Sequence, residues 1–251
     1  MKTALITGST SGIGQAIARR LAKDNFLLII CGRRQQRLEE LKNELSSTAR
    51  VVMASFDVRY REEVEQALNP VLKDHDIDVL VNNAGNAHGF NFIQDGNMDD
   101  WDAMIDGNVK GLLYVSKLVV QGMVKRKSGH IINIGSIAGK EVYPKGNVYC
   151  ASKFAVDAIS QGMRLDLNEY GIRVSQISPG LVDTEFSEVR FKGDKERAAG
   201  VYAGMEALTA EDIADIAHFI LFRPAHVNIA DIVVFPTAQA SSTIVNRHSE
   251  R

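Results

Sequence analysis

The chain has 251 residues, five prolines and a formal net charge of −2, which fits one large α/β domain better than two small ones. Its 45% hydrophobic and 24% charged residues are typical of a globular protein. The charge balance excludes the basic footprint of a nucleic-acid-binding protein, while small neutral or anionic ligands remain compatible with it.

The N-terminal segment carries no pattern of a targeting sequence. One lysine precedes a short apolar run that stops at Thr7 and Gly8, and this run is too short for a secretion signal or a membrane span. The two cysteines, Cys31 and Cys150, lie far apart without a CxxC motif. Two reduced thiols are expected, with a disulfide as the alternative. We therefore expect a cytoplasmic protein without membrane contact.

Short apolar runs alternate with longer amphipathic segments along the chain. The runs are Thr3–Thr7, Leu27–Cys31, Val51–Ser55, Val79–Asn82, Ile131–Ile134, Val174–Ile177 and Ile232–Phe235. Continuous apolar runs of this length predict strands that are buried on both faces. The helices expected between them are Gly12–Asp24, Gln35–Ser46, Arg61–Lys73, Met98–Lys127, Asn147–Tyr170 and Ala210–Phe222. This alternation predicts a doubly wound α/β fold with a parallel sheet, in a single domain over residues 1–251.

A glycine-rich turn follows the first predicted strand and opens the first helix. Its glycines allow a tight turn and close backbone approach, while the free amides and the dipole of the helix N-terminus attract a pyrophosphate. In the first βα turn this pattern favours a dinucleotide cofactor over a turn without a ligand. The expected cofactor contacts of the turn are Gly8, Ser9, Ser11, Gly12, Ile13 and Gly14.

Two arginines follow the second predicted strand. Roughly 20 residues beyond the glycines, folds that bind NAD carry an acid for the ribose 2′-hydroxyl. Here the position holds Arg33 and Arg34. Guanidinium groups bind a 2′-phosphate in bidentate fashion and stack on adenine, so we expect NADP(H) as the cofactor. The alternative is a solvated corner between strand and helix.

Tyr149 and Lys153 lie four residues apart in the predicted helix Asn147–Tyr170. This spacing puts the phenol and the ammonium on one helix face, where the cation is expected to lower the pKa of the tyrosine. We predict Tyr149 as the general acid and base, with a packed tyrosine as the alternative. Ser136 follows the strand 130–135, at the edge where α/β sheets bind ligands, and can hydrogen-bond the substrate oxygen.

Three further features of the chain lead to expectations. Asn108 lies within the predicted helix Met98–Lys127, where asparagine is a mediocre helix former, so it indicates either a function or a helix irregularity. Residues 184–205 lack clear periodicity and are predicted as a substrate loop, and residues 237–251 as a surface tail or an intersubunit contact. The six histidines are scattered, so no metal site is expected.

Taken together, these motifs resemble the short-chain dehydrogenase/reductase family. The resemblance covers Lys2 to about Pro236 and rests on the glycine spacing, on Asn82-Asn83-Ala84-Gly85, and on Asn108, Ser136, Tyr149 and Lys153. It implies the sheet order 3-2-1-4-5-6-7, a Lys153 that also binds the nicotinamide ribose, and an Asn108 that holds a proton-relaying water. The further cofactor contacts that it implies are Asp57, Val58, Asn83, Ala84, Gly85, Pro179, Gly180, Val182 and Thr184.

Other strings, among them Asn133-Ile-Gly-Ser136 and Pro224-Ala-His-Val-Asn-Ile229, are similar to a branch of NADP-dependent 3-hydroxy acid dehydrogenases. The resemblance implies hydride transfer between NADP(H) and a small 3-hydroxy acid such as serine, allo-threonine or 3-hydroxypropionate. The alternatives are a 3-oxoacyl carrier-protein reductase, a broad carbonyl reductase, and a catalytically silent nucleotide-sensing or structural protein. The intact Asn108, Ser136, Tyr149 and Lys153 argue against the silent protein.

A small acid substrate requires a cation, and Arg190 is the only arginine between Arg173 and Arg197. Since arginine suits a carboxylate best, we expect Arg190 to bind the substrate, with a solvated loop charge as an equal alternative. The resemblance also implies a homotetramer, with a dimer as the alternative. Its subunits are expected to share the helices Met98–Lys127 and Asn147–Tyr170.

Overall fold

The computed structural model describes residues 1–247 and contains one sheet of seven strands. The strands are β1 (Lys2–Ile6), β2 (Phe26–Gly32), β3 (Arg50–Ser55), β4 (Val79–Asn82), β5 (Gly129–Ile134), β6 (Ile172–Pro179) and β7 (Asp231–Val234). They are all parallel and follow the order β3-β2-β1-β4-β5-β6-β7. The predicted doubly wound α/β fold and its strand order are therefore confirmed.

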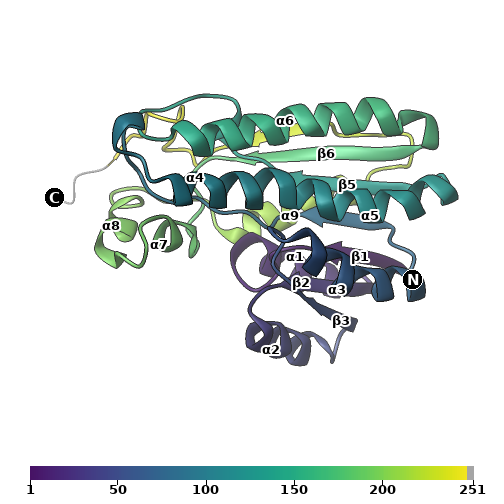
Figure 1. Cartoon of the computed structure of the whole chain (residues 1–251). Helices are drawn as coiled ribbons and strands as arrows, with labels where there is room; N and C mark the ends of the chain where they lie inside the picture. Colours follow the sequence, from purple (N-terminus) through teal and green to yellow (C-terminus); the bar gives the residue numbers. More distant parts are fainter. Residues whose placement is uncertain (248–251) are drawn as a thin grey trace.

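Helices cover both faces of this sheet (Figure 1). They are α1 (Gly12–Ala22), α2 (Gln35–Leu45), α3 (Arg61–Asp74), α4 (Met98–Ile105), α5 (Gly111–Arg126), α6 (Asn147–Leu167), α7 (Phe186–Arg190), α8 (Lys195–Gly200) and α9 (Ala210–Leu221). One apolar cluster joins the sheet to α1, α2 and α9, and a second joins it to α3 and α5 and the end of α6. Among the described residues, no helix is both long and apolar enough to cross a membrane.

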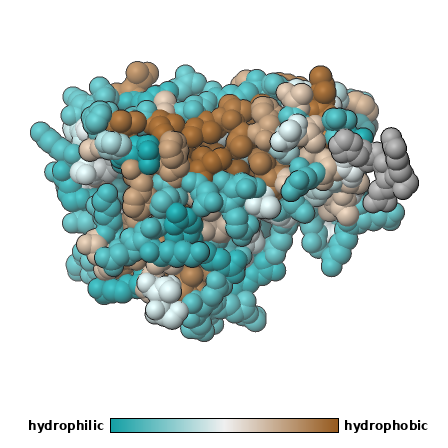
Figure 2. All heavy atoms as spheres, turned by 180° about the vertical axis from the view of Figure 1, so that it is seen from behind, coloured by the Kyte–Doolittle hydropathy of each residue, from teal (hydrophilic) through white to brown (hydrophobic). Residues whose placement is uncertain are grey.

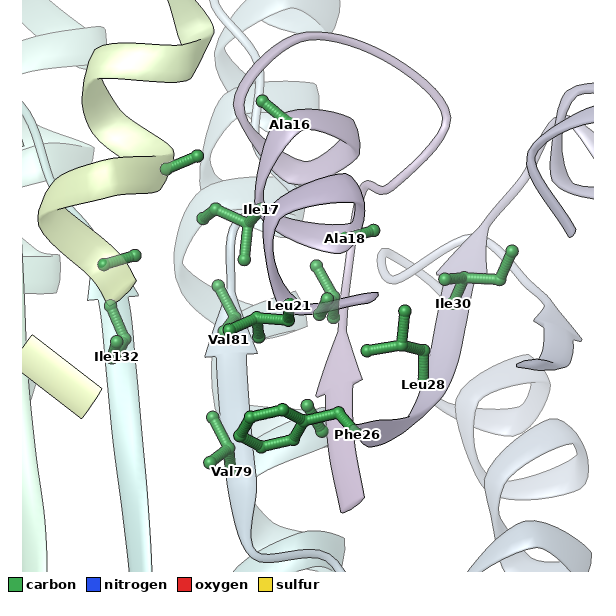
Figure 3. Packing of buried hydrophobic residues seen from close by; sticks show 14 of the residues in the cluster. Ala16, Ile17, Ala18, Leu21, Phe26, Leu28, Ile30, Val79, Val81 and Ile132 are labelled. Atoms are coloured by element: carbon green, nitrogen blue, oxygen red, sulfur yellow. The ribbon is translucent and has the colours of Figure 1, made fainter. Parts of the chain in front are cut away.

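The alternation of side chains along β2 explains why the predicted strands read as continuous apolar runs. Phe26, Leu28 and Ile30 belong to the first cluster, whereas Leu27 and Ile29 belong to the second. Successive side chains of a strand point to opposite faces, so a strand covered on both sides must be apolar throughout. Figure 3 shows that the face of β2 with Phe26, Leu28 and Ile30 is turned toward α1.

The long helix predicted over Met98–Lys127 is interrupted in the structure. Helices α4 and α5 are joined by a π-helical turn at Asp106–Lys110, in which Asn108 is buried. An extra residue in a helix turn of this kind frequently marks a functional position. The expectation of an unbroken helix was therefore wrong, because periodicity alone does not distinguish one long helix from two coaxial ones.

The segment 184–205, which shows no clear periodicity in the sequence, contains α7 and α8. Both helices are short, and they lie together at one end of the molecule (Figure 1). Farther along, the Leu181 amide donates to Gln239 Oε1 at 2.8 Å, and the Ser242 amide donates to Glu141 Oε2 at 2.8 Å. The predicted tail 237–251 thus contacts its own chain as far as it is described, and its residues 248–251 lie outside the described residues.

Figure 2 shows an apolar area on the face turned away from the viewer in Figure 1. Among the exposed apolar side chains, Phe219 belongs to α9, Phe222 follows it, and Val233 belongs to β7. Strand β7 is the outermost strand on its side of the sheet. An edge strand with exposed apolar neighbours is a surface on which another chain can pair.

Candidate active site

A cleft of about 280 Å³ opens where β1, β2, β4, β5 and β6 end. Parallel sheets bind ligands at this edge, because the strand order reverses on either side of β1. The predicted residues that line the cleft are Gly8, Ser11, Gly12, Ile13, Arg33, Arg34, Asp57, Val58, Asn83, Ala84, Gly85, Ser136, Tyr149, Lys153, Pro179, Gly180, Val182 and Thr184. Four predicted residues do not line it, namely Ser9, Gly14, Asn108 and Arg190.

The glycine turn forms one wall of the cleft. Gly8 and Gly12 have φ values of +66° and +51°, which glycine adopts without strain. A Cβ on Gly14 would lie 2.4 Å from Asn83 Nδ2, so this glycine permits the close packing of α1 against the segment after β4. The side chain of Ser11, at the N-cap of α1, makes no capping hydrogen bond, so the first amides of the helix are available to an anion. The turn therefore fits a pyrophosphate.

Ser9 was predicted as a cofactor contact, but the structure uses its hydroxyl to join two strands. The Oγ atom lies 2.9 Å from the Ile6 carbonyl oxygen and 3.0 Å from that of Cys31, and it accepts from the Cys31 amide at 2.9 Å. Cys31 and Cys150 are both free thiols and buried. Sequence spacing could not show that Ser9 points away from the cleft.

The two arginines after β2 occupy different environments. Arg33 is 59% exposed, and its Nη1 atom lies 3.5 Å from the carboxylate of Asp57. Arg34 donates from Nε and Nη2 to Thr10 Oγ1 at 3.1 and 2.8 Å, and from Nη2 to Ser11 Oγ at 2.7 Å. Both guanidinium groups border the cleft beside the glycine turn. This corner can therefore receive an anionic group such as a 2′-phosphate.

Asp57 and Arg59 form a second charged corner of the cleft. Arg59 Nη2 lies 2.7 Å from Asp57 Oδ2. Burial of Asp57 acts to raise the pKa of its carboxyl, but the hydrogen bonds and charge of Arg59 outweigh burial and keep this pKa below its ordinary value. Sequence reasoning identified Asp57 and missed Arg59, which stands two residues further on in a segment without any motif.

Tyr149 and Lys153 lie on the first turns of α6 and face the same end of the cleft. The two side chains are almost completely buried, with residue exposures of 8% and 7%. Lys153 Nζ donates to the Ile134 carbonyl oxygen at 3.0 Å and lies 6.0 Å from the centroid of the Tyr149 ring. Ser136, which caps the 3₁₀ turn Ile137–Gly139, is within hydrogen-bonding reach of the phenol.

The expected lowering of the Tyr149 pKa by Lys153 is not found. Burial raises the pKa of the phenol above its ordinary value, the neighbouring Tyr143 adds to this, and the hydrogen bond to Ser136 offsets it in part. Burial also lowers the pKa of Lys153 to about 8. Lys153 donates to the Ile134 carbonyl and does not offset the effect of burial, so the phenol stays protonated at neutral pH.

Asn108 lies in the π-helical turn between α4 and α5, where its side chain makes several hydrogen bonds. Its Nδ2 atom donates to the Asn86 carbonyl at 2.8 Å and to Ser152 Oγ at 2.9 Å, and its Oδ1 accepts from the Asn86 amide at 2.7 Å. Ser152 Oγ in turn donates to the Tyr149 carbonyl at 2.7 Å. Asn108 thereby connects the first turn of α6 to the segment after β4. The predicted helix irregularity is therefore present, and a function of Asn108 stays a prediction.

Arg190, at the end of α7, lies beside Tyr149. Its Nε donates to the Gly89 carbonyl at 3.3 Å and its Nη1 to the Tyr143 hydroxyl at 3.1 Å. The guanidinium carbon is 4.7 Å from the ring centroid of Phe90 and 5.5 Å from that of Tyr149. Arg190 is therefore not a solvated loop charge. It lines a smaller hollow that meets the cleft at Tyr149.

Comparison with known proteins places these features in context. Residues 2–195 match a family described as short chain dehydrogenase. The NADP-dependent 3-hydroxy acid dehydrogenase YdfG of Salmonella typhi is 46% identical over 238 residues, which are 94% of this chain and 95% of that protein. Sulfoacetaldehyde reductase 2 of Chromohalobacter salexigens is 41% identical over 240 residues, 95% of each protein.

A solved structure described as the closed form of serine dehydrogenase complexed with NADP+ is also similar. It has a TM-score of 0.90 and 42% sequence identity, and the match covers 99% of this chain and all of that chain.

Proposed function

The chain belongs to the short-chain dehydrogenase family, and we propose that it transfers hydride between NADP(H) and the hydroxyl or carbonyl carbon of a small 3-hydroxy acid. It is an NADP-dependent oxidoreductase that acts on CH–OH groups. The proposed substrates are of the serine, allo-threonine or 3-hydroxypropionate type. The proposed catalytic residues are Asn108, Ser136, Tyr149 and Lys153.

The observation that carries this substrate class is the position of Arg190. A cation packed among Phe90, Tyr143 and Tyr149 is partly shielded from water, which strengthens its interaction with a carboxylate. The carboxyl carbon of a 3-hydroxy acid is two carbon–carbon bonds from its hydroxyl carbon. The close approach of Arg190 to the Tyr149 ring suits such a short separation. Residues 184–205, which carry Arg190, are the proposed substrate loop.

The residues of the cleft have separate roles in this proposal. The amides at the start of α1 bind the pyrophosphate, and Arg33, next to Arg34, binds the 2′-phosphate. NADP(H), when bound, supplies or accepts the hydride. Tyr149 holds the proton that moves to or from the substrate oxygen, and Ser136 orients that oxygen. Lys153 holds the nicotinamide ribose and electrostatically supports the developing negative charge on Tyr149.

A second candidate function is the reduction of a small sulfonated aldehyde. A sulfonate also pairs with a guanidinium group, so Arg190 does not by itself distinguish the two acids. The likeness to sulfoacetaldehyde reductase 2 favours this candidate. A broad carbonyl reductase and a 3-oxoacyl carrier-protein reductase act on substrates without a free short-chain acid, and Arg190 gives them no support.

The experiment that tests the function compares small hydroxy acids with neutral alcohols of similar size. NADP+ reduction is followed with serine, allo-threonine, 3-hydroxypropionate, 3-hydroxybutyrate and isethionate, and with 1-propanol and 1,3-propanediol as neutral controls. Preference for the carboxylates in kcat/KM supports the proposal, and preference for isethionate supports the second candidate. Equal kcat/KM for acids and neutral alcohols would remove the acid-specific function and leave a broad carbonyl reductase.

We also propose that the protein works in the cytoplasm as a homotetramer. Leu113 on α5 and Phe154 and Leu165 on α6 expose apolar side chains, and so do Phe219 and Val233 on the opposite face. Two separate apolar faces suit two subunit contacts. Light scattering after size-exclusion chromatography measures the mass, and a monomer at micromolar concentration would contradict the proposal.

A further inference from the structure

An ion-pair cluster joins the segment after β6 to the other wall of the cofactor cleft. Glu185, directly before α7, accepts from Arg34 Nη1 at 2.9 Å through Oε2. Both of its carboxylate oxygens also accept from Arg37 Nη1 on α2, at 2.7 and 2.9 Å. Arg34 and Glu185 border the cleft, whereas Arg37 stands outside it. The cluster therefore links the segment after β6 to Arg34 and to the start of α2 at the border of the cleft.

We infer that Glu185 is a positioning residue that fastens residues 184–205 over the cofactor cleft through Arg34 and Arg37, and thereby controls how fast NADP(H) enters and leaves. This inference rests on the proposed function only in taking the cleft as the NADP(H) site. It assigns different roles to the two adjacent arginines. Arg34 connects the glycine turn to the segment after β6, and Arg33 binds the 2′-phosphate.

The contacts of Arg34 carry the first step of this argument. Its Nε and Nη2 are directed to Thr10 and Ser11 in the glycine turn, and its Nη1 to Glu185. A guanidinium group whose Nε, Nη1 and Nη2 atoms already donate to other groups has no free pair of N–H donors for bidentate binding of a phosphate. Arg33, which is 59% exposed, keeps its guanidinium in solvent at the mouth of the same corner.

Packing beside the cluster carries the second step. A Cβ on Gly12 would lie 3.3 Å from Cβ and Cγ2 of Thr184, so the segment after β6 rests directly on the glycine turn. Thr184, Glu185, Phe186 and Val189 all line the cleft. A nucleotide held between these residues and the turn leaves only if the segment moves away. The rate of that movement depends on the bonds that hold the segment.

The exposure of the cluster carries the third step. The side chains of Arg34, Arg37 and Glu185 are 37%, 43% and 41% exposed. Partly exposed ion pairs are weak and are screened by salt, so they can break and form again in each turnover. Hydrogen bonds from both arginines outweigh the burial of Glu185 and keep the pKa of its carboxyl below the ordinary value. The ion pairs of Glu185 with Arg34 and Arg37 thus stay charged near neutral pH.

The test measures NADPH release and the opening of the segment separately. Stopped-flow fluorescence gives the release rate for Glu185→Gln, Arg37→Met and the double variant, and amide hydrogen exchange of the unliganded proteins reports opening of residues 184–205. The matched controls are Glu188→Gln on α7, and Arg61→Met, which breaks a surface ion pair with Glu65 on α3. Because Arg37 lies outside the cleft, its variant leaves the cofactor contacts in place.

We expect Glu185→Gln to raise the release rate about 3- to 10-fold and Arg37→Met about 2- to 5-fold, with faster exchange in residues 184–205. The double variant should equal Glu185→Gln alone, because both changes remove the same contact. Higher salt should raise the release rate of the unaltered protein and have less effect on Glu185→Gln. The single-turnover rate of hydride transfer should stay unchanged in Arg37→Met, which lies outside the cleft, and the two controls should release NADPH like the unaltered protein.

An unchanged NADPH release rate and unchanged amide exchange in Glu185→Gln and Arg37→Met would contradict the inference that Glu185 fastens the segment. Additive effects in the double variant would contradict it as well. If the unaltered protein fails to bind NADPH, the assignment of the cleft is wrong. In that case the exchange measurement alone still decides whether Glu185 fastens the segment.

Discussion

Lys153 is buried and has no carboxylate partner within residues 1–247, so replacing it with methionine should stabilise the unliganded protein while it abolishes function. Burial lowers the pKa of the ammonium from 10.5 to about 8. At about 1.4 kcal/mol for each tenfold change in proton affinity, this fall costs the folded state about 3 kcal/mol at pH 7. The hydrogen bond to the Ile134 carbonyl offsets about 1 to 2 kcal/mol of this cost.

The expected net effect of Lys153→Met is a gain of about 1 to 2 kcal/mol in the free energy of unfolding at pH 7. Between pH 8 and 10.5 the unfolded chain binds the proton of this lysine and the folded chain does not. The stability of the unaltered protein therefore rises with pH in this interval, relative to the variant, and the advantage of the variant is lost.

Urea unfolding of both proteins without cofactor, at several pH values from 7 to 10.5, measures this difference. Lys117→Met, at an exposed position of α5, is the matched control. Lys153→Met should also lose NADPH binding and turnover together, because one ammonium serves both. A variant that is less stable at pH 7, or a difference that is constant over this pH range, would refute the reasoning.

Three other substitutions test the remaining roles. Tyr149→Phe should leave NADPH binding nearly intact in a fluorescence titration but lower kcat by at least ~100-fold, and near-normal turnover would exclude Tyr149 as the acid–base group. Arg33→Asp should weaken NADP+ by about 1.5–3 kcal/mol, or more than tenfold in Kd, with little effect on NAD+; an unaltered protein that already favours NAD+ would contradict this. Arg190→Ala should raise KM for serine or 3-hydroxypropionate about 10- to 100-fold while a neutral carbonyl compound is reduced almost as before, and equal losses for both would assign Arg190 to loop closure instead.

The strands and most helices could be predicted because their signals are local. Strand β2 is apolar at every position since both of its faces are covered, and the predicted run Leu27–Cys31 lies within the observed Phe26–Gly32. The break between α4 and α5 could not be located in this way. An asparagine inside a helical pattern indicated an irregularity, but its form, a π-helical turn, depends on the partners that Asn108 finds in Asn86 and Ser152.

The residues of the candidate site could also be identified from the sequence, whereas the pKa shifts of their side chains could not. Spacing placed Tyr149 and Lys153 on one face of α6, which the structure confirms. It did not reveal that Lys153 donates to Ile134, or that burial and Tyr143 raise the pKa of Tyr149. The free energy of a charge depends on the atoms around it, and these atoms come from β5 and from the segment before α6.

The sequence alone therefore determined the doubly wound fold, the glycine turn and the spacing of the side chains proposed for catalysis, because each depends on neighbours within a few residues along one element. Only the tertiary structure decided which groups these side chains meet. It separated Arg33 from Arg34, brought Arg190 from a segment without periodicity to Tyr149, and linked Arg34 to Glu185. Arg34 and Glu185 are 151 positions apart in the chain, and no local pattern encodes a contact over that separation.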